Sequence, residues 1–334
     1  MKRKIYDDQL IIITGAAGFI GSNVVHYLNQ QGYYNLVLVD DFHESPKWKN
    51  LLGAKYVDFV SKYEIFDWLD EREDDIEAFI HLGANSATTE LDGDYLLENN
   101  YRFSVRLAEY ALHHDHRFIY ASSAATYGRG EQGFSDNHDL LDELRPMNLY
   151  GYTKHMFDLW LKRQGALDDV VGLKYFNIFG PRECHKGRMA SMAYHMTKKI
   201  LLEGKVGLFK SSEPEKYGDG DQVRDFLYVT DAAKMTCYFL ENAEEGGIYN
   251  IGMGKTHTWN QLAKGVFNAL GKEPNIEYIP MPEDLVKQYQ NYTLADMTKF
   301  KTVSESPFTP VELEAACDDY INKYLLAYLE ENNS

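Results

Sequence analysis

Apolar and polar positions along the first half of the chain predict strands that alternate with helices. Short apolar runs, rich in Ile and Val, are each followed by a longer stretch whose apolar residues recur at helical spacing. Strands joined by helical crossovers form parallel sheets. The pattern predicts strands at Gln9–Thr14, Asn35–Asp40, Phe79–Ala84, Phe118–Ser123 and Val170–Asn177, and helices that include Tyr95–His113 and Tyr150–Arg163.

A glycine-spaced turn follows the first predicted strand. Gly15, Gly18 and Gly21 stand between that strand and an amphipathic helix. Glycine lets the backbone approach a pyrophosphate closely, and the start of the helix offers free N–H groups and a positive dipole end. The second strand ends on Asp40, about twenty residues on, where an acidic residue usually binds the adenosine ribose. These features together predict a dinucleotide-binding site.

The pattern loosens after Gly180-Pro181, which indicates a second structural unit. Its predicted elements are helices at Met189–Leu202, Asp231–Glu241, Trp259–Leu270 and Pro310–Glu331, strands at Asp225–Thr230 and Ile248–Gly252, and a charged loop at Lys210–Gln222. We therefore expect an α/β protein with a Rossmann-like doubly wound parallel sheet and a smaller C-terminal α/β substrate lobe. The expected division is 1–176 for the dinucleotide-binding domain and 177–334 for the substrate-binding lobe, with 225–242 packing back onto the first domain.

Composition narrows the class of protein. The 334 residues carry a net charge of −17, which argues against a nucleic-acid partner and against an anionic membrane surface. The three cysteines are unclustered and odd in number, so we expect neither a disulfide scaffold nor a metal site. The apolar run after Lys2-Arg-Lys4 breaks off too early for a signal peptide, and no segment is long enough to span a bilayer. The sequence predicts a cytoplasmic protein.

Three residues have the types and spacing of a hydride-transfer site. Tyr150 and Lys154 are four positions apart and so share one face of a predicted helix, and Ser123 ends a predicted strand. Taking a proton from an alcohol requires a base whose pKa lies near the working pH, whereas a free tyrosine titrates at about 10. We expect Lys154 and an oxidised nicotinamide to supply the positive charge that favours the anion of Tyr150. Ser123 would hydrogen-bond the alcohol and its ketone.

These motifs resemble the extended branch of the short-chain dehydrogenase/reductase superfamily, which includes nucleotide-sugar epimerases, dehydratases and reductases. Four segments narrow the resemblance to the ADP-L-glycero-D-manno-heptose 6-epimerase family, from about Leu10 to Phe300 and more weakly beyond. The segments are Ala121–Gly128, Asn148–Lys154, Lys174–Ser191 and Arg224–Val229. The most specific of them contains the run Pro-Arg-Glu-Cys-His-Lys-Gly at 181–187.

The resemblance implies an isomerase that inverts the C6″ carbon of an ADP-heptose for lipopolysaccharide core synthesis. Hydride passes from C6″ to NADP⁺, a 6″-ketone forms, and hydride returns to the opposite face, so no reductant is consumed. Carried over by motif, Tyr150 is one acid/base and Lys186 is the other, with Lys154 reaching the nicotinamide ribose. The family also implies a nucleotide-sugar as the binding partner and a homopentamer.

The same resemblance assigns contacts to cofactor and substrate. The residues implied for the cofactor are Gly15, Gly18, Phe19, Ile20, Gly21, Asp40, Asp41, Lys47, Lys62, Leu82, Gly83, Ala84, Asn85, Ser86, Asn99, Lys154, Ile178 and Lys186. Those implied for the substrate are Ser123, Asn177, Arg188, His195, Phe209, Lys210, Ser211, Ser212, Arg224 and Tyr289. Two of the substrate residues have an alternative: His195 could equally be an interior histidine, and Arg224 could pair with Asp225.

Two questions stay open at this point. Lys47 and Lys62 suit the 2′-phosphate of NADP, but Asp41 stands where the family more often has Asn, and a second carboxylate favours NAD. We place NADP first. The chain also departs from the family pattern at Leu82, Cys184, Arg188 and an apparent insertion at 216–222. These departures affect the details of the substrate pocket and not the type of reaction.

Other functions remain as alternatives. A UDP-hexose 4-epimerase or a nucleotide-sugar dehydratase would share the first half of the chain. The 4-epimerases lack the lysine-bearing run, however, and dehydratases carry an acidic pair where this chain has Ser123-Ala-Ala. A non-catalytic NADP-binding sensor would be expected to lose Tyr150 or Lys154, and both are present.

Overall fold

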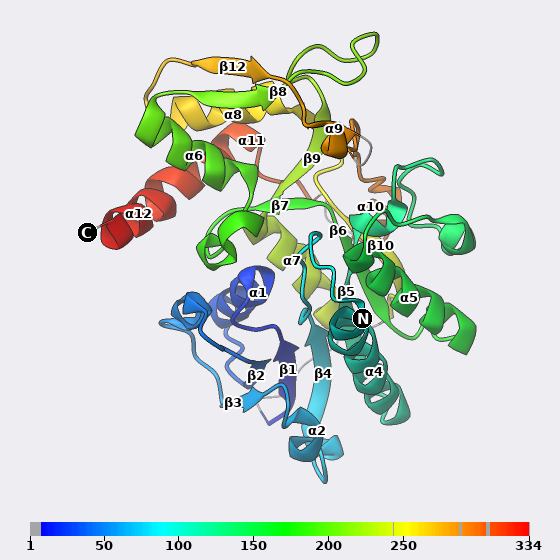
Figure 1. Ribbon diagram of the computed structural model, residues 1–334. Coiled ribbons are helices and arrows are strands. Elements are labelled where there is room, and N and C mark those ends of the chain that lie inside the picture. The colour runs from blue at the N-terminus through cyan, green and yellow to red at the C-terminus, as the bar shows by residue number, and fades with distance from the viewer. Residues whose placement is uncertain (1–7, 243, 287–288, 305–307, 334) are drawn as a thin grey trace.

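The computed structural model describes residues 8–242, 244–286, 289–304 and 308–333, so Lys2-Arg-Lys4 lies outside the described residues. Within them, seven parallel strands form one sheet in the order β10-β6-β5-β4-β1-β2-β3 (Figure 1). The strands are β1 (Leu10–Thr14), β2 (Leu36–Asp40), β3 (Asp58–Ser61), β4 (Ile76–His81), β5 (Arg117–Ser123), β6 (Val171–Tyr175) and β10 (Gly247–Ile251). Because the strand order runs outward in both directions from β1 and β4, the predicted doubly wound sheet is confirmed.

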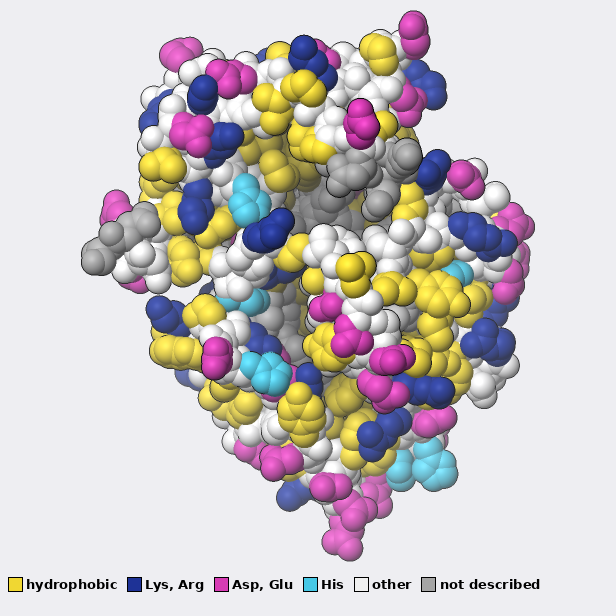
Figure 2. Space-filling model, in the orientation of Figure 1, with side chains coloured by type: hydrophobic (Ala, Val, Ile, Leu, Met, Phe, Trp, Pro, Cys, Tyr) yellow, Lys and Arg dark blue, Asp and Glu magenta, His cyan; other side chains and the backbone are white. Residues whose placement is uncertain are grey.

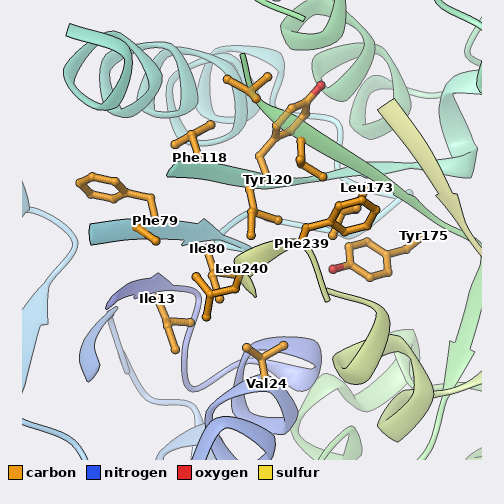
Figure 3. Packing of buried hydrophobic residues seen from close by; sticks show 14 of the residues in the cluster. Ile13, Val24, Phe79, Ile80, Phe118, Tyr120, Leu173, Tyr175, Phe239 and Leu240 are labelled. Atoms are coloured by element: carbon orange, nitrogen blue, oxygen red, sulfur yellow. The ribbon is translucent and has the colours of Figure 1, made fainter. Parts of the chain in front are cut away.

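Helices cover both faces of this sheet. α1 (Phe19–Gln30) and α7 (Val229–Glu241) pack against each other on one face, and α4 (Phe103–His113) and α5 (Leu149–Gln164) lie on the other (Figure 1). In Figure 3, Val24 of α1 and Leu240 of α7 face Ile13 and Ile80, whereas Tyr120 points to the opposite side. Successive side chains of a strand point to opposite faces, so a sheet covered on both sides needs strands that are apolar throughout.

The second unit has its own hydrophobic core. Two small sheets, β11-β9-β7 and β12-β8, combine with α6, α8 and α11 in the upper part of Figure 1. The elements are β7 (Asn177–Phe179), α6 (Met192–Glu203), β8 (Val206–Phe209), β9 (Val223–Tyr228), β11 (Thr256–Thr258), α8 (Trp259–Ala269), β12 (Ile276–Ile279), α9 (Glu283–Val286), α10 (Thr298–Val303), α11 (Leu313–Tyr320) and α12 (Leu326–Asn333). The remaining short elements are η1 (Pro46–Leu51), α2 (Ile65–Trp68), η2 (Glu73–Asp75), α3 (Gly93–Leu96), η3 (Leu97–Arg102), η4 (Ala124–Tyr127), η5 (His138–Glu143), η6 (Cys184–Met189) and η7 (Ile321–Leu325).

The late part of the chain returns to the first core. Leu240 on α7, Ile248 on β10 and Phe300 on α10 are all buried in the same hydrophobic cluster as the strands of the large sheet. The chain therefore crosses between its two cores more than once. The division at residue 176, with 225–242 belonging to the first domain, stays a prediction.

Several predicted boundaries were wrong. The strand expected at Phe79–Ala84 is β4, which ends at His81, and Leu82–Ser86 leave the sheet. The strand expected to continue to Asn177 ends at Tyr175, because its neighbours β5 and β10 end there, and Asn177 begins β7 beside β9. The strand expected at Asp225–Thr230 is β9, so Val229 and Thr230 already belong to α7. Strands β3, β7, β8, β11 and β12 were not predicted.

No helix in the described part of the chain is long and apolar enough to cross a membrane.

Candidate active site

The carboxyl ends of β1, β2, β4 and β5 open into a cavity of about 730 Å³. Its walls come from both units, with Asp40 and Tyr150 on one side and Lys186 and Trp259 on the other. Figure 2 shows the molecule hollowed between its two parts, with Lys, Arg and His side chains along one rim of the hollow. Ligands of open parallel sheets bind at this edge, beyond the strand ends.

The glycine turn between β1 and α1 leaves no room for side chains. Gly15 has φ +66°, and a Cβ atom there would lie 2.7 Å from Gly83 Cα. A Cβ atom on Gly21 would lie 2.1 Å from the carbonyl oxygen of Gly15. The turn thus forms a tight backbone cradle. α1 begins at Phe19 with no side-chain cap, which leaves its first N–H groups without a side-chain partner, and Gly18, Phe19 and Ile20 line the cavity. This is the shape that a pyrophosphate requires.

Two carboxylates and two lysines meet at the end of β2. Asp40 accepts hydrogen bonds from the backbone N–H of Ala17 at 2.8 Å and from Lys47 Nζ at 2.7 Å. Asp41 accepts from Lys62 Nζ at 2.6 Å, and Lys62 also donates to Asn99 Oδ1 at 3.1 Å. Burial alone would lower the pKa of Lys62, but its hydrogen bond and charge interaction with Asp41 raise the pKa instead. Each lysine is therefore held by a carboxylate.

Tyr150, Lys154 and Ser123 meet where α5 begins beside the end of β5. Asn148 caps α5 by accepting a hydrogen bond from Gly151 N at 2.8 Å, which fixes the first turn that carries Tyr150. Burial raises the pKa of Tyr150, and a hydrogen bond with Ser123 opposes the rise. Burial also lowers the pKa of Lys154 to about 8, and the Lys154 ammonium donates to the Ala121 carbonyl oxygen at 2.8 Å. We expected positive charge to lower the pKa of Tyr150. In the protein without cofactor, burial has the larger effect and the pKa is raised.

A buried ion pair lies behind these residues. Asp158, one turn after Lys154 on α5, accepts from Lys174 Nζ at 2.6 Å, Ser122 Oγ at 2.8 Å and Tyr120 OH at 2.9 Å. Both charged side chains are almost completely buried, at 1% and 0% exposure. The pair therefore ties α5 to the ends of β5 and β6, on which the alignment of Tyr150 and Ser123 depends.

Removing one partner of this pair should destabilise the protein strongly. We expect Lys174→Met to lower the free energy of unfolding by about 3–5 kcal/mol, because it leaves a carboxylate buried without its counter-ion. Lys162→Met is the matched control, since Lys162 pairs with Asp142 at the same 2.6 Å on the exposed side of α5 and should change stability by at most about 1 kcal/mol. Urea denaturation measures both. Equal losses in the two variants would contradict this role for Lys174.

Lys186 enters the cavity from the loop between β7 and α6. Its Nζ lies 5.5 Å from the centre of the Phe19 ring, at the start of α1. Burial lowers the pKa of Lys186, although the nearby charge of Glu183 raises it in part. Glu183 itself accepts from Ser191 N at 2.6 Å and Ser191 Oγ at 2.7 Å, which closes the base of the loop. Lys186 thus lies next to the glycine turn. It is far from Tyr150 in the sequence, but both residues line the same cavity.

The structure brings many of the predicted residues into this one cavity. All residues implied for the cofactor, all four implied for catalysis, and Asn177 line it. The other residues implied for the substrate are not among those that line it. They are Arg188, His195, Phe209, Lys210, Ser211, Ser212, Arg224 and Tyr289.

Arg224 and Tyr289 nevertheless border the cavity through Trp259. The Arg224 guanidinium lies 5.4 Å from the Trp259 ring and 5.1 Å from the Tyr289 ring, and Trp259 Nε1 donates to Tyr289 OH at 2.8 Å. Phe209 packs edge-on against Tyr289 at 6.4 Å. The alternative pairing of Arg224 with Asp225 is not observed among the described residues. Asp225 instead accepts from the backbone N–H groups of 253, 254 and 295.

The remaining substrate candidates lie in two groups outside the cavity. His195 Nε2 is 3.3 Å from the Arg188 carbonyl oxygen, and the two residues are half-buried and exposed respectively. Lys210, Ser211 and Ser212 lie in the loop after β8, where Ser211 N donates to Asp219 Oδ1 at 2.9 Å. A contact between these groups and a ligand stays a prediction.

Sequence reasoning missed several residues that line the cavity. His185 and Glu183 stand in the run that contains Lys186, so their position beside that lysine was a usable signal. Trp259, Phe226 and Met192 also line it, but nothing in the sequence separates them from ordinary core residues. Their place is set by the packing of the second unit onto the first.

The fold and the cavity at the strand ends define a Rossmann-like enzyme of the dinucleotide-binding class, and comparison with known proteins agrees. The sequence model of the NAD dependent epimerase/dehydratase family matches residues 11–252, and the chain belongs to this family. Its curated relatives include proteins named ADP-L-glycero-D-manno-heptose-6-epimerase. One from Nitratidesulfovibrio vulgaris is 45% identical over 95% of this chain and 98% of the relative, and one from Fusobacterium nucleatum is 41% identical with the same coverage. The resemblance found in the sequence is confirmed.

Solved structures show the same fold. The crystal structure of the Helicobacter pylori ADP-L-glycero-D-manno-heptose-6-epimerase matches with a TM-score of 0.78 and 28% identity, covering 96% of this chain and 97% of that one. A UDP-N-acetylglucosamine 4-epimerase from Methanobrevibacter ruminantium also matches with a TM-score of 0.78, at 25% identity over 96% and 99% of the two chains. Fold alone therefore does not separate 6-epimerases from 4-epimerases.

Proposed function

We propose that this chain is an isomerase that interconverts ADP-D-glycero-β-D-manno-heptose and ADP-L-glycero-β-D-manno-heptose by inverting C6″. The observation that carries the proposal is the placement of Tyr150 and Lys186 in one cavity, on two different elements. Inversion gives alcohols of opposite hand, and each requires a proton acceptor or donor on its own side of the carbon. Two acid/base groups that approach from separate walls meet this requirement.

A nicotinamide cofactor fits the same cavity. The backbone cradle at Gly15 and Gly21 has no room for a Cβ atom, and Asp40 stands at the adenosine end. When bound, the nicotinamide supplies the chemistry of accepting a hydride from a sugar carbon and returning it. Lys154 would bind its ribose and Ser123 would hold the alcohol oxygen, so that the carbon faces the hydride acceptor.

The two acid/base groups have pKa shifts of opposite direction. Burial raises the pKa of Tyr150, which keeps its proton on, and burial lowers the pKa of Lys186, which favours the neutral amine. These directions favour Tyr150 as the proton donor and Lys186 as the acceptor. We propose that Lys186 removes the hydroxyl proton from one heptose isomer and that Tyr150 returns a proton to the ketone on the other side, after which Lys186 releases its proton to water and Tyr150 takes one up. The reverse reaction exchanges these roles.

We propose NADP as the cofactor, with NAD as the alternative. Lys47 and Lys62 supply two positive charges at the adenosine end, but Asp40 and Asp41 hold them at 2.7 and 2.6 Å. A 2′-phosphate would have to compete with Asp41 for Lys62. Asp41 therefore controls the choice between the two cofactors.

Asp41→Asn should strengthen NADP⁺ binding. The substitution keeps the side-chain shape, removes a carboxylate that repels a phosphate and frees Lys62. We expect the dissociation constant of NADP⁺ to fall about tenfold, equivalent to about 1.4 kcal/mol, while that of NAD⁺ changes little. Calorimetric titration of both cofactors at equal salt measures this, and Lys62→Met should act in the opposite direction. A strong NAD⁺ preference in the unchanged chain would overturn the choice of NADP.

Incubation with the proposed substrate tests the function directly. Purified protein is mixed with ADP-D-glycero-β-D-manno-heptose, and NMR follows the configuration at C6″ while absorbance follows the nicotinamide. We expect the L-glycero isomer to appear without net consumption of NADPH. Consumption of NADPH would indicate a reductase. Turnover of UDP-glucose or UDP-N-acetylglucosamine in place of the heptose would indicate a 4-epimerase.

The resemblance to the heptose epimerases supports two wider proposals. We propose that the product serves lipopolysaccharide core synthesis and that the protein forms a homopentamer. Exposed apolar side chains such as Leu91 and Leu202, at 85% and 84% exposure, are available for contacts between subunits. Light scattering of the purified protein would give the subunit number.

A further inference from the structure

The loop that carries Lys186 is joined to the dinucleotide-binding elements by side-chain amides. This loop runs from Gly180 to Ser191 and contains three backbone positions with positive φ: Gly180 at +139°, Arg182 at +71° and Gly187 at +54°. At its base, Asn23 of α1 donates to the Pro181 carbonyl oxygen at 3.0 Å and accepts from Arg182 Nη1 at 2.9 Å. The base of the loop is therefore fixed on α1.

Asn50 makes a second connection, nearer to Lys186. It lies in η1, and its Nδ2 is 3.1 Å from the Arg182 carbonyl oxygen and 3.1 Å from His185 Nδ1. The same Nδ2 donates to the carbonyl oxygen of Ala17 at 2.9 Å, inside the glycine turn. One side-chain amide thus touches both the cofactor turn and the residue next to Lys186.

The backbone around Asn50 is itself well fixed. His26 Nε2 of α1 lies 2.9 Å from the Asn50 carbonyl oxygen, and Lys47, one turn earlier in η1, binds Asp40. Asp40 in turn accepts from Ala17 N. Asp40, Ala17 and Asn50 therefore form a continuous chain of contacts from the end of β2 to the Lys186 loop.

We propose that Asn50 is a positioning residue, whose amide holds the Lys186 loop in register with the glycine turn. This inference rests on the proposed function for its meaning in catalysis. Lys186 has to lie within hydrogen-bond reach of a sugar hydroxyl whose carbon faces the nicotinamide, and the glycine turn fixes the cofactor. A displacement of about 1 Å between two such groups lowers the rate by up to about 100-fold. Asn50 is the contact that sets this distance directly.

Asn50→Leu and Asn50→Asp test the proposal, with Asn29→Leu as the matched control. Leu and Asp have nearly the shape of Asn but lack its N–H donors. Asn29 is likewise a half-buried asparagine, and its amide joins α1 to the Lys55 backbone at 2.9 Å, away from the cavity. All variants are compared as full-length protein with bound NADP⁺.

Two readouts separate positioning from general stability. Steady-state kinetics with the ADP-heptose gives kcat and KM. NMR titration of the ¹³C-dimethylated lysines gives the pKa of Lys186, whose signal is identified by its absence in Lys186→Arg. We expect Asn50→Leu to lower kcat by about tenfold or more with KM and cofactor affinity nearly unchanged. The pKa of Lys186 should rise toward the ordinary lysine value as the loop loosens and admits water.

The negative charge of Asn50→Asp should raise that pKa further, and Asn29→Leu should change neither readout. The proposal is overturned if Asn50→Leu leaves the pKa of Lys186 unchanged. It is also overturned if kcat falls only in proportion to cofactor affinity, because Asn50 would then act through the glycine turn alone. Should the unchanged protein fail to epimerise the heptose, the proposed function falls, while the lysine titration still decides the role of Asn50.

Discussion

Lys186→Met is expected to lower kcat for epimerisation by about 100-fold to 10,000-fold, the usual contribution of a general acid or base. Met keeps most of the length of the side chain and its contact with Phe19 but cannot exchange a proton. Cofactor affinity should change far less than kcat, because the substitution leaves the backbone cradle and the residues around Asp40 intact, although Lys186 lies next to the glycine turn. Initial rates from NMR of the C6″ configuration, with NADP⁺ titrations alongside, measure both effects.

Two further variants define what Lys186 contributes. Lys186→Arg keeps the positive charge but does not lose a proton near neutral pH, so it should be as inactive as the Met variant. Lys198→Met removes an exposed lysine on α6 that contacts Tyr194 and should leave the rate unchanged. Full turnover by Lys186→Met, or recovery of activity in Lys186→Arg, would reduce Lys186 to a binding residue.

Tyr150→Phe should lower kcat by a similar factor, because it removes the phenolic hydroxyl beside Ser123 and nothing else. The ring can still fill its half-buried position at the start of α5, so the free energy of unfolding should change little. Tyr152→Phe is the matched control: Tyr152 lies two residues further along the same helix and is 52% exposed.

The two catalytic variants should also differ in their partial reactions. If Lys186 accepts the proton from one heptose isomer, Tyr150→Phe should still reduce bound NADP⁺ with that isomer in a single turnover. Lys186→Met should do so only with the other isomer. Absorbance of the reduced nicotinamide in rapid mixing experiments measures this. Identical behaviour of both variants with both isomers would contradict separate roles.

The sequence predicted the large sheet well, because its strands are short apolar runs between helices of clear periodicity. The strands it missed are of a different kind. β3, β8 and β12 alternate or carry charge at their edges, as in Asp58–Ser61 and Ile276–Ile279, and they pair at the margins of sheets. The predicted end of β4 lay three residues too late, because Leu82–Ala84 continue its apolar run although they leave the sheet beside Gly15. Only the tertiary contact with the glycine turn determines that end.

The site was predictable where motifs have fixed spacing. Glycine spacing, the Tyr-x-x-x-Lys pair and the run around Lys186 led to residues that share one cavity. The ion pair of Asp158 with Lys174 was not predictable in this way, because it forms only where two strands and a helix meet. Asn50 and Trp259 were missed for the same reason, since each acquires its neighbours from segments far away in the sequence.

The return of the late chain to the first core has a consequence for how the protein is made. β10 pairs with β6, and Phe300 is buried among residues of the large sheet. During synthesis, the nascent nucleotide-binding unit therefore keeps the edge of β6 uncovered until β10 (Gly247–Ile251) has left the ribosome, and part of its interior uncovered until Phe300 has done so. Exposed strand edges of this kind invite aggregation. Folding of this enzyme should thus be a late, largely post-translational event that benefits from chaperones, rather than a sequence of independent domains closing one after the other.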